Sequence, residues 1–111
     1  MLTGSIPTWI GQFVDLEQLW FEDNRLTGTI PSELQQLTSL VTLSINWNKL
    51  SGTVPSWIGD LSHLTELFLC NNVFTGTFPA EIGRNQNLKD FCLVGNNFIG
   101  DLPAEIHSDS D

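Results

Sequence analysis

A repeat of 24 residues constrains the fold of this chain more than any other feature of its sequence. A glycine, a polar residue, an apolar residue and a proline recur without insertion at residues 4–7, 28–31, 52–55, 76–79 and 100–103. Other apolar columns keep the same step, such as Leu16, Leu40, Leu64 and Leu88. A fixed period of this length is typical of a solenoid, whose stacked turns together bury a core that no single turn can bury.

Each repeat predicts one strand and one tight turn. Around residues 19–21, inward apolar residues alternate with exposed ones, which is typical of a half-buried strand. Such a strand can pair only with its equivalent in the next repeat, so the sheet is expected to be parallel. The segment 31–37 spaces its apolar residues more widely and predicts a short helical or 3₁₀ turn on the far side. Pro31 suits the start of that turn, where its missing N–H is no loss.

Two columns place polar side chains at positions that are expected to face the interior of the fold. One column consists of Asn24, Asn48, Asn72 and Asn96. A buried amide without partners costs about 1–3 kcal/mol, so we expect a ladder of hydrogen bonds to the backbone of the same and the adjacent turn. Sugar or metal binding by these residues is the less favoured alternative. The other column changes from leucine to Asn85, so the last full repeat is expected to be the loosest unless Asn85 turns outward or finds partners.

The consensus over residues 37–55 resembles the plant-type leucine-rich repeat of receptor-kinase ectodomains, receptor-like proteins and polygalacturonase inhibitors. The family spacing is kept by its leucines and by Asn48, Gly52 and Pro55. The sequence Leu-Thr-Gly-Thr-Ile-Pro at residues 26–31 is characteristic of this subclass. The resemblance covers roughly residues 2–107. It implies an α/β solenoid, a right-handed superhelix with a short parallel sheet on its concave face and 3₁₀ or helical turns on its convex face.

We expect a single domain over residues 1–111. It consists of a partial repeat 1–12, full repeats 13–36, 37–60, 61–84 and 85–108, and an acidic tail 109–111. The cysteine-bearing caps that are usual in the family are not visible at either end. The chain is therefore expected to be either a piece of a longer array or an isolated stack whose uncapped ends can associate end to end.

The exposed strand positions are expected to form a binding surface on the concave face. Alternation assigns to it Gln18, Trp20, Glu22; Thr42, Ser44, Asn46; Glu66, Phe68, Cys70; and Asp90, Cys92, Val94, with Asp23, Trp47, Asn71 and Gly95 at the rim. Exposed aromatic residues beside charges are typical of interface hot spots. The candidate binding residues are Gln18, Trp20, Glu22, Asp23, Trp47, Glu66, Phe68 and Asp90. Alternatively, the aromatics only cover their neighbours and the acids only keep the face soluble.

The charge of the chain limits the partners that it can bind. Thirteen acidic residues against four basic ones give a formal net charge of −9. Nucleic acid is excluded because phosphate binding needs clustered lysine and arginine, whereas a basic protein or peptide is favoured. No apolar run is long enough for a membrane span, so no direct membrane contact is expected. Glu66 and Asp90 should be neighbours that could accept a lysine, an arginine or Ca²⁺, although screening by Lys89 or water is favoured and no metal site is predicted.

No catalytic constellation or cofactor motif is present. His63 precedes a strand and His107 is near the chain end, so neither converges with a nucleophile. Two histidines and two cysteines lack zinc spacing, and no phosphate loop occurs. Cys70 and Cys92 should share a face at a diagonal distance of about 8 Å, beyond the roughly 7 Å that a disulfide allows. Two free thiols are therefore predicted, unless stagger between the strands permits a bridge.

Two functions remain: a recognition module that binds through the concave face, or a structural spacer within a larger array. Four short strands offer roughly 500 Å², whereas a stable interface usually takes about 800 Å² per partner. The chain is thus expected to contribute part of a larger binding surface or to bind weakly. The resemblance favours an extracellular or secretory location. The lack of a visible signal segment and of a glycosylation acceptor keeps an intracellular location open.

Overall fold

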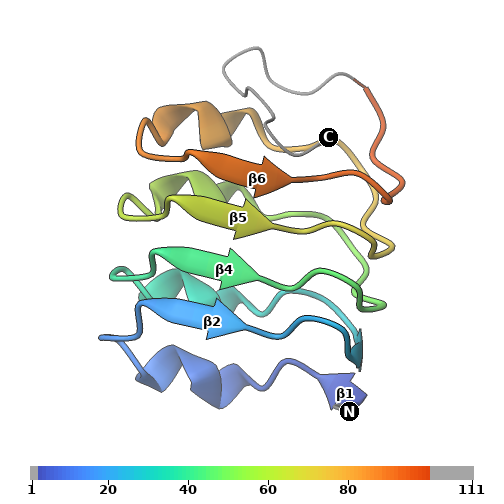
Figure 1. The fold of residues 1–111 in the computed structure, drawn as a ribbon, viewed down its shortest axis with the longest axis horizontal. Coiled ribbons are helices and arrows are strands. Elements are labelled where there is room, and N and C mark those ends of the chain that lie inside the picture. The colour runs from blue at the N-terminus through green and yellow to red at the C-terminus, as the bar shows by residue number, and fades with distance from the viewer. Residues whose placement is uncertain (1–2, 101–111) are drawn as a thin grey trace.

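The structure is a computed structural model that describes residues 3–100, which form a stack of similar turns (Figure 1). The elements are β1 (Thr3–Ser5), η1 (Thr8–Gln12), β2 (Gln18–Trp20), β3 (Arg25–Thr27), η2 (Ser32–Gln36), β4 (Thr42–Ser44), η3 (Ser56–Asp60), β5 (Glu66–Phe68), η4 (Ala80–Arg84) and β6 (Asp90–Cys92). Most of the fifth glycine–proline segment, His107 and the tail 109–111 lie outside the described residues.

Four strands form the main parallel sheet in the order β2-β4-β5-β6. Its register places Leu19 opposite Leu43, Leu43 opposite Leu67, and Leu67 opposite Phe91. Residues one repeat apart are therefore lateral neighbours, and the predicted solenoid with a parallel sheet is confirmed. β1 and β3 form a separate two-stranded parallel sheet, beyond the carboxyl ends of the main strands (Figure 1).

The core fills the space between the main sheet and the 3₁₀ helices behind it (Figure 1). Leu43 and Leu67 from the sheet, and Leu34 and Ile58 from the helices, are completely buried. Each fully buried leucine or isoleucine contributes about 1.5–3 kcal/mol relative to an exposed one. Because each turn packs only against its neighbours, the stacking of turns stabilises the fold and sets the spacing of every surface residue.

Every 3₁₀ helix begins directly after a proline. Pro31 precedes η2 with φ −70° and ψ 140°, and at the other end the N–H of Leu37 donates to the carbonyl of Leu34. The proline ring fixes φ near this value and removes an N–H that would lack a partner at a helix start. The arrangement recurs at Pro7, Pro55 and Pro79, so the proline column explains why each repeat turns at the same point.

The asparagine column links neighbouring turns by hydrogen bonds. The Oδ1 atom of Asn72 accepts a bond from the N–H of Leu50 at 3.1 Å, and its Nδ2 donates to the carbonyl of Ile45 at 2.9 Å, both in the preceding turn. Asn24 donates to the carbonyl of Glu22 in its own turn at 2.8 Å. The full pattern recurs one turn earlier and one turn later, at Asn48 and Asn96.

Asn85 is also buried and paired. Its Nδ2 donates to the carbonyls of Leu61 at 2.9 Å and Leu64 at 3.2 Å, and its Oδ1 accepts the N–H of Asn87 at 3.0 Å. The leucine column therefore accepts an asparagine by giving its amide backbone partners. The last full repeat was expected to be the loosest unless Asn85 found partners. Asn85 has such partners, so it gives no reason for fraying.

Candidate binding surface

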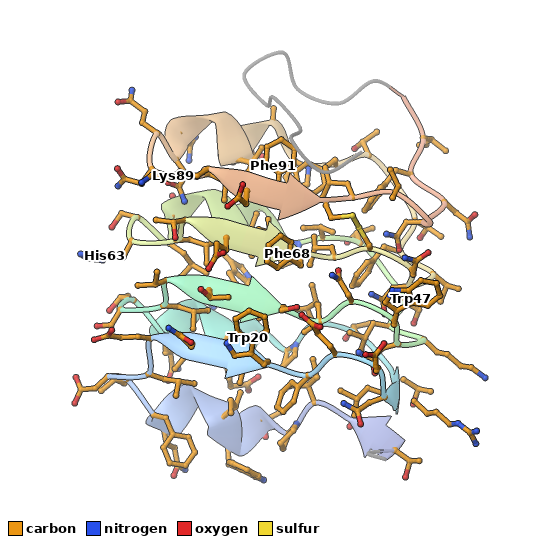
Figure 2. All side chains as sticks on the ribbon, viewed as in Figure 1. Trp20, Trp47, His63, Phe68, Lys89 and Phe91 are labelled. Carbon is orange, nitrogen blue, oxygen red and sulfur yellow. A yellow bond between two sulfur atoms is a disulfide. The ribbon has the colours of Figure 1, made fainter. Side chains whose placement is uncertain are left out.

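The register of the main sheet aligns the candidate residues in rows across the concave face, on which Figure 2 labels Trp20 and Phe68. One row contains Gln18, Thr42, Glu66 and Asp90, and the next contains Trp20, Ser44, Phe68 and Cys92. Backbone hydrogen bonds continue this alignment beyond the strands, from the N–H of Asp23 to the carbonyl of Asn46 and from the N–H of Trp47 to that of Cys70. The sequence-predicted residues thus lie on one continuous surface.

Thr42 and Ser44 are buried, so the expectation that all alternate residues of the second strand would be exposed is wrong. Their side chains keep 1% and 0% exposure. The hydroxyl of Thr42 donates to Glu66 Oε1 at 2.6 Å, and that of Ser44 donates to Glu22 Oε1. Longer side chains on the neighbouring strands cover these two small residues, which is why alternation alone misplaces them. β4 therefore forms the floor between the flanking strands β2 and β5.

Aromatic side chains rise on both sides of this floor (Figure 2). Trp20 on β2 is 51% exposed, and its indole N–H donates to Gln18 Oε1 at 3.1 Å, which orients the ring. Phe68 on β5 is half-buried, and Ser44 lies between the two in the register. Two strand steps separate these side chains by about 10 Å, so a partner side chain could lie between them.

Trp47 lies at the rim in an unfavourable backbone conformation. Its φ is +61°, in the left-handed region, and its side chain is 60% exposed. The same column holds Asp23, Asn71 and Gly95, residue types that tolerate this region far better than tryptophan. Within residues 3–100 the indole makes no hydrogen bond and no ring contact. Neither a hydrogen bond nor a ring contact within the described residues accounts for tryptophan at this position.

The acids of the concave face are not neutralised by ion pairs. Glu66 and Asp90 are paired in the register, as expected. Over the described part of the chain, the only ion pair joins Arg84 to Asp60 at 3.7 Å, between two exposed side chains on the 3₁₀ side. The proposed screening by Lys89 therefore involves no direct pairing. No cluster of three potential ligands for a metal ion occurs in residues 3–100.

Cys70 and Cys92 form a disulfide, so the prediction of two free thiols is wrong. The estimate of about 8 Å assumed extended strands through residue 70. β5 instead ends at Phe68, and the chain bends to a left-handed residue, Asn71, with φ +61°. The bend brings the two Cα atoms to 5.3 Å, within the range that a disulfide allows. The bond joins adjacent turns at the edge of the candidate surface.

Among the described residues, His63 and the two cysteines do not converge on one site. His63 is exposed, and its Nδ1 lies 3.1 Å from the carbonyl of Thr38, away from the concave sheet. Both cysteines are joined to each other. No helix within residues 3–100 has the length and apolar character needed to cross a membrane.

Comparison with known families identifies the repeat. The leucine-rich-repeat model matches residues 15–37, 39–61 and 63–85, more than half of the chain. The chain belongs to the leucine-rich-repeat family. No curated protein matches it in sequence.

Solved structures of leucine-rich-repeat proteins superpose closely on the chain. The Arabidopsis receptor kinase HAESA, in complex with the peptide hormone IDA and the co-receptor SERK1, is 37% identical over 92% of this chain, with a TM-score of 0.89. The plant peptide hormone receptor RGFR1, in complex with RGF2, is 35% identical over 95%, with a TM-score of 0.92. A plant ice-binding protein is 37% identical over 87%, with a TM-score of 0.85. The chain spans 17% of each receptor chain and 32% of the ice-binding protein.

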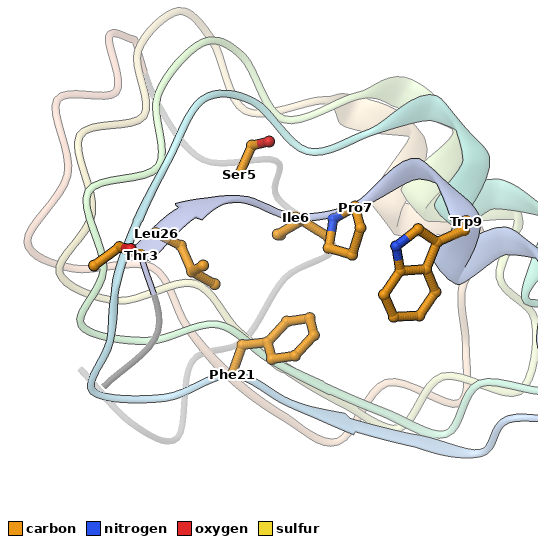
Figure 3. Close-up of a pocket in the computed structure, with 7 residues that line it drawn as sticks. All are labelled: Thr3, Ser5, Ile6, Pro7, Trp9, Phe21 and Leu26. Carbon is orange, nitrogen blue, oxygen red and sulfur yellow. The ribbon is translucent and has the colours of Figure 1, made fainter.

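The leucine-rich-repeat core opens at the end of the stack that carries β1 (Figure 3). A cavity of about 250 Å³ is lined there by Thr3, Ser5, Ile6, Pro7, Trp9, Phe21 and Leu26. The lining is mainly apolar, since Ile6, Phe21 and Leu26 come from the inward columns and Trp9 from η1, while Thr3 and Ser5 of β1 add two hydroxyls. An apolar group from a further turn or a second chain would fit this opening.

A second surface, which the repeat pattern does not predict as a site, lies on the flank at β1, β3 and their equivalents. Two columns of hydroxyl residues border the glycine column: Thr3, Thr27, Ser51 and Thr75 before it, and Ser5, Thr29, Thr53 and Thr77 after it. All are exposed except Ser51, which is half-buried. The repeat itself carries the signal, because threonine or serine recurs at both positions in four successive turns.

Proposed function

We propose that the chain is a recognition module that binds a protein or peptide through its concave face. The observation that carries the proposal is Trp47, which is 60% exposed at a left-handed backbone position. A left-handed conformation costs an ordinary residue about 1–2 kcal/mol. Strain of this kind is retained at sites where the side chain serves function. A spacer within an array would need neither this tryptophan nor the exposed Trp20.

The charge of the face indicates the chemistry of the partner. Glu22, Asp23, Glu66 and Asp90 lie among the aromatics, and none of them takes part in an ion pair within the described residues. A basic peptide would supply the missing positive charges, while its apolar side chains pack against Trp20 and Phe68. The similar receptors HAESA and RGFR1 were solved in complex with IDA and RGF2, respectively. Since the chain covers only part of such receptors, we propose that it forms part of a longer receptor-like surface.

The disulfide supports an extracellular or secretory location. Cys70 and Cys92 are bonded in the structure, and such bonds persist in oxidising compartments but are rare in the cytosol. Similar structures are described as ectodomains. An extracellular location would also give the face access to secreted peptides.

Selection of binders from a displayed library of random peptides tests this function. We expect the binders to be rich in lysine and arginine. Changing Trp47 to Asn, which the next turn has at the equivalent position, should weaken their Kd at least about tenfold, a loss of about 1.4 kcal/mol. Phe13→Ala is the control, because Phe13 is an aromatic residue that is 51% exposed at the end of η1, on the 3₁₀ side. If substitutions on the concave face leave peptide binding intact, or if no peptide is selected, the result would favour the structural spacer instead.

We also propose a second candidate function, binding to ice. The specific observation is the pair of hydroxyl columns on the flank, which hold threonine or serine in four successive turns before the inner column ends at Ile99. The similar plant ice-binding protein covers most of the chain. Inhibition of ice recrystallisation by the purified chain tests this function, and the absence of any effect at all concentrations would exclude it.

A further inference from the structure

We infer that the flank with the two hydroxyl columns is the surface that contacts ice, an inference that rests on the second proposed function. For the rest of this section, this surface of Thr3, Ser5, Thr27, Thr29, Ser51, Thr53, Thr75 and Thr77 is called the hydroxyl flank. It lies apart from the concave face, because β1 and β3 belong to a separate sheet. The two surfaces can therefore be altered independently.

The backbone sets a constant spacing along the hydroxyl flank. The N–H of Ser51 donates to the carbonyl of Gly28, and the N–H of Thr75 donates to that of Gly52, both at 2.8 Å. β1 and β3 continue the same parallel pairing, with Thr3 opposite Arg25 and Ser5 opposite Thr27. Parallel pairing fixes neighbouring turns at about 4.8 Å. This register places an outer-column hydroxyl of one turn opposite an inner-column hydroxyl of the next, as with Ser5 and Thr27, and equivalent hydroxyls recur once per turn with a constant shift of two residues along the chain.

Glycines hold the outer column in a single orientation. A Cβ added to Gly52 would lie 2.9 Å from the Cγ2 methyl of Thr29, and one added to Gly76 would lie 2.9 Å from that of Thr53. Each threonine methyl thus packs over the glycine of the next turn. Because χ1 of threonine is restricted by its branched Cβ, the packed methyl also directs the hydroxyl. The column is ordered before any ligand binds.

The hydroxyls of the outer column are available to water. Those of Ser5, Thr29, Thr53 and Thr77 have no protein partner among residues 3–100. The inner column is held more tightly, since the hydroxyls of Ser51 and Thr75 donate to glycine carbonyls at 3.3 and 3.4 Å. A hydroxyl can donate one bond and accept two, so each free one can take the place of a water molecule in a hydrogen-bonded lattice.

The composition of the hydroxyl flank suits ice better than a peptide. Residues 27–31, 51–55 and 75–79 contain no charged side chain, and the exposed Arg25 and Lys49 lie at the border of the flank. A peptide interface needs distinct anchors, whereas each turn here offers nearly the same groups. A hollow lined by Thr53, Thr77 and Glu81 lies at the last described turns. Ice differs from liquid water by presenting its oxygen atoms in straight rows at one repeat. Ordered rows of hydroxyl and methyl groups match that property, and their fixed rotamers reduce the entropy lost on binding.

Incorporation of the fluorescently labelled chain into a slowly growing ice shell tests the inference. Thr53→Lys should abolish incorporation, because a long charged side chain would hold the ice surface away. Thr53→Val keeps the methyl that packs on Gly76 but removes the hydroxyl, and should reduce incorporation. Gln35→Lys adds the same charge on η2 and should incorporate like the native chain. Circular dichroism of each variant establishes that the fold is retained.

The outcomes separate the inference from the function on which it rests. If Thr53→Lys is no longer incorporated into ice while Gln35→Lys still is, the hydroxyl flank is supported as the contact surface. Undiminished incorporation of both Thr53 variants, with loss in a Trp20→Ala variant, would overturn the hydroxyl flank while leaving ice binding in place. Exclusion of the native chain from ice would end the ice-binding function and this inference together.

Discussion

Loss of the Cys70–Cys92 disulfide should lower the free energy of unfolding by about 3 kcal/mol. The bond joins residues separated by 22 positions, nearly one full turn of the solenoid. The chain-entropy relation gives about 3.4 kcal/mol at 25 °C for a loop of this length. For a domain of about 100 residues, each kcal/mol shifts Tm by about 4–8 °C. Reduction of the bond should therefore lower Tm by roughly 12–24 °C.

Urea unfolding with and without reductant measures this effect, followed by the fluorescence of the four tryptophans. The control is the double variant Cys70→Ala, Cys92→Ala, whose unfolding should not respond to reductant. Comparison of this variant with the reduced native chain gives the effect of replacing the cysteine side chains by alanine on packing. This effect must be known because Cys70 is only 2% exposed. The difference between oxidised and reduced native protein then reports the cross-link alone.

Two results would refute the reasoning at different points. Alkylation of both thiols in the folded chain before any reduction, detected as a mass increase, would show that the disulfide does not form. If the bond forms but its reduction moves the free energy of unfolding by less than about 1 kcal/mol, the entropic argument fails. The unfolded chain would then be restricted already, without the cross-link.

Three further changes test other parts of the structure. Asn72→Ala should cost about 2–3 kcal/mol in urea unfolding, because it leaves the N–H of buried Leu50 unpaired; a loss below about 1 kcal/mol would contradict the ladder. Gly52→Ala should cost more than about 1–2 kcal/mol, since φ is +81° and the new Cβ would meet Thr29. Gly4→Ala, with a similar φ but no atom within 4 Å, should cost less, and equal losses would exclude the contact. If stacks associate through the apolar opening, light scattering should show that the mass of the native protein rises with concentration. The Trp9→Lys variant should stay monomeric. A native chain that also stays monomeric would contradict this association.

The repeat period predicts the parts of the structure that depend on position within a turn. Leu19, Leu43 and Leu67 align in the sheet because equal spacing along the chain becomes lateral contact in a solenoid. The proline column likewise predicts where each 3₁₀ helix begins. Neither inference needs the size or chemistry of neighbouring side chains.

Features that depend on contacts between turns could not be predicted in this way. Ser44 has the alternation of an exposed residue, yet its burial depends on the larger side chains of the strands beside it. The distance between Cys70 and Cys92 depends on a bend after Phe68 that the strand pattern does not contain. Asn85 breaks a leucine column, but backbone carbonyls within reach satisfy its amide. In each case the outcome depends on local geometry.

The two candidate surfaces differ in how their residues change from turn to turn. On the concave face one column reads Gln18, Thr42, Glu66 and Asp90, so each turn offers different chemistry. On the hydroxyl flank both columns hold threonine or serine in four successive turns, and the inner column then ends at Ile99. A varied surface suits a partner with its own sequence, whereas a uniform one suits a ligand that is itself periodic. Because the surfaces use different positions of the same turn, and distant changes act additively, variants of one should leave binding at the other unchanged.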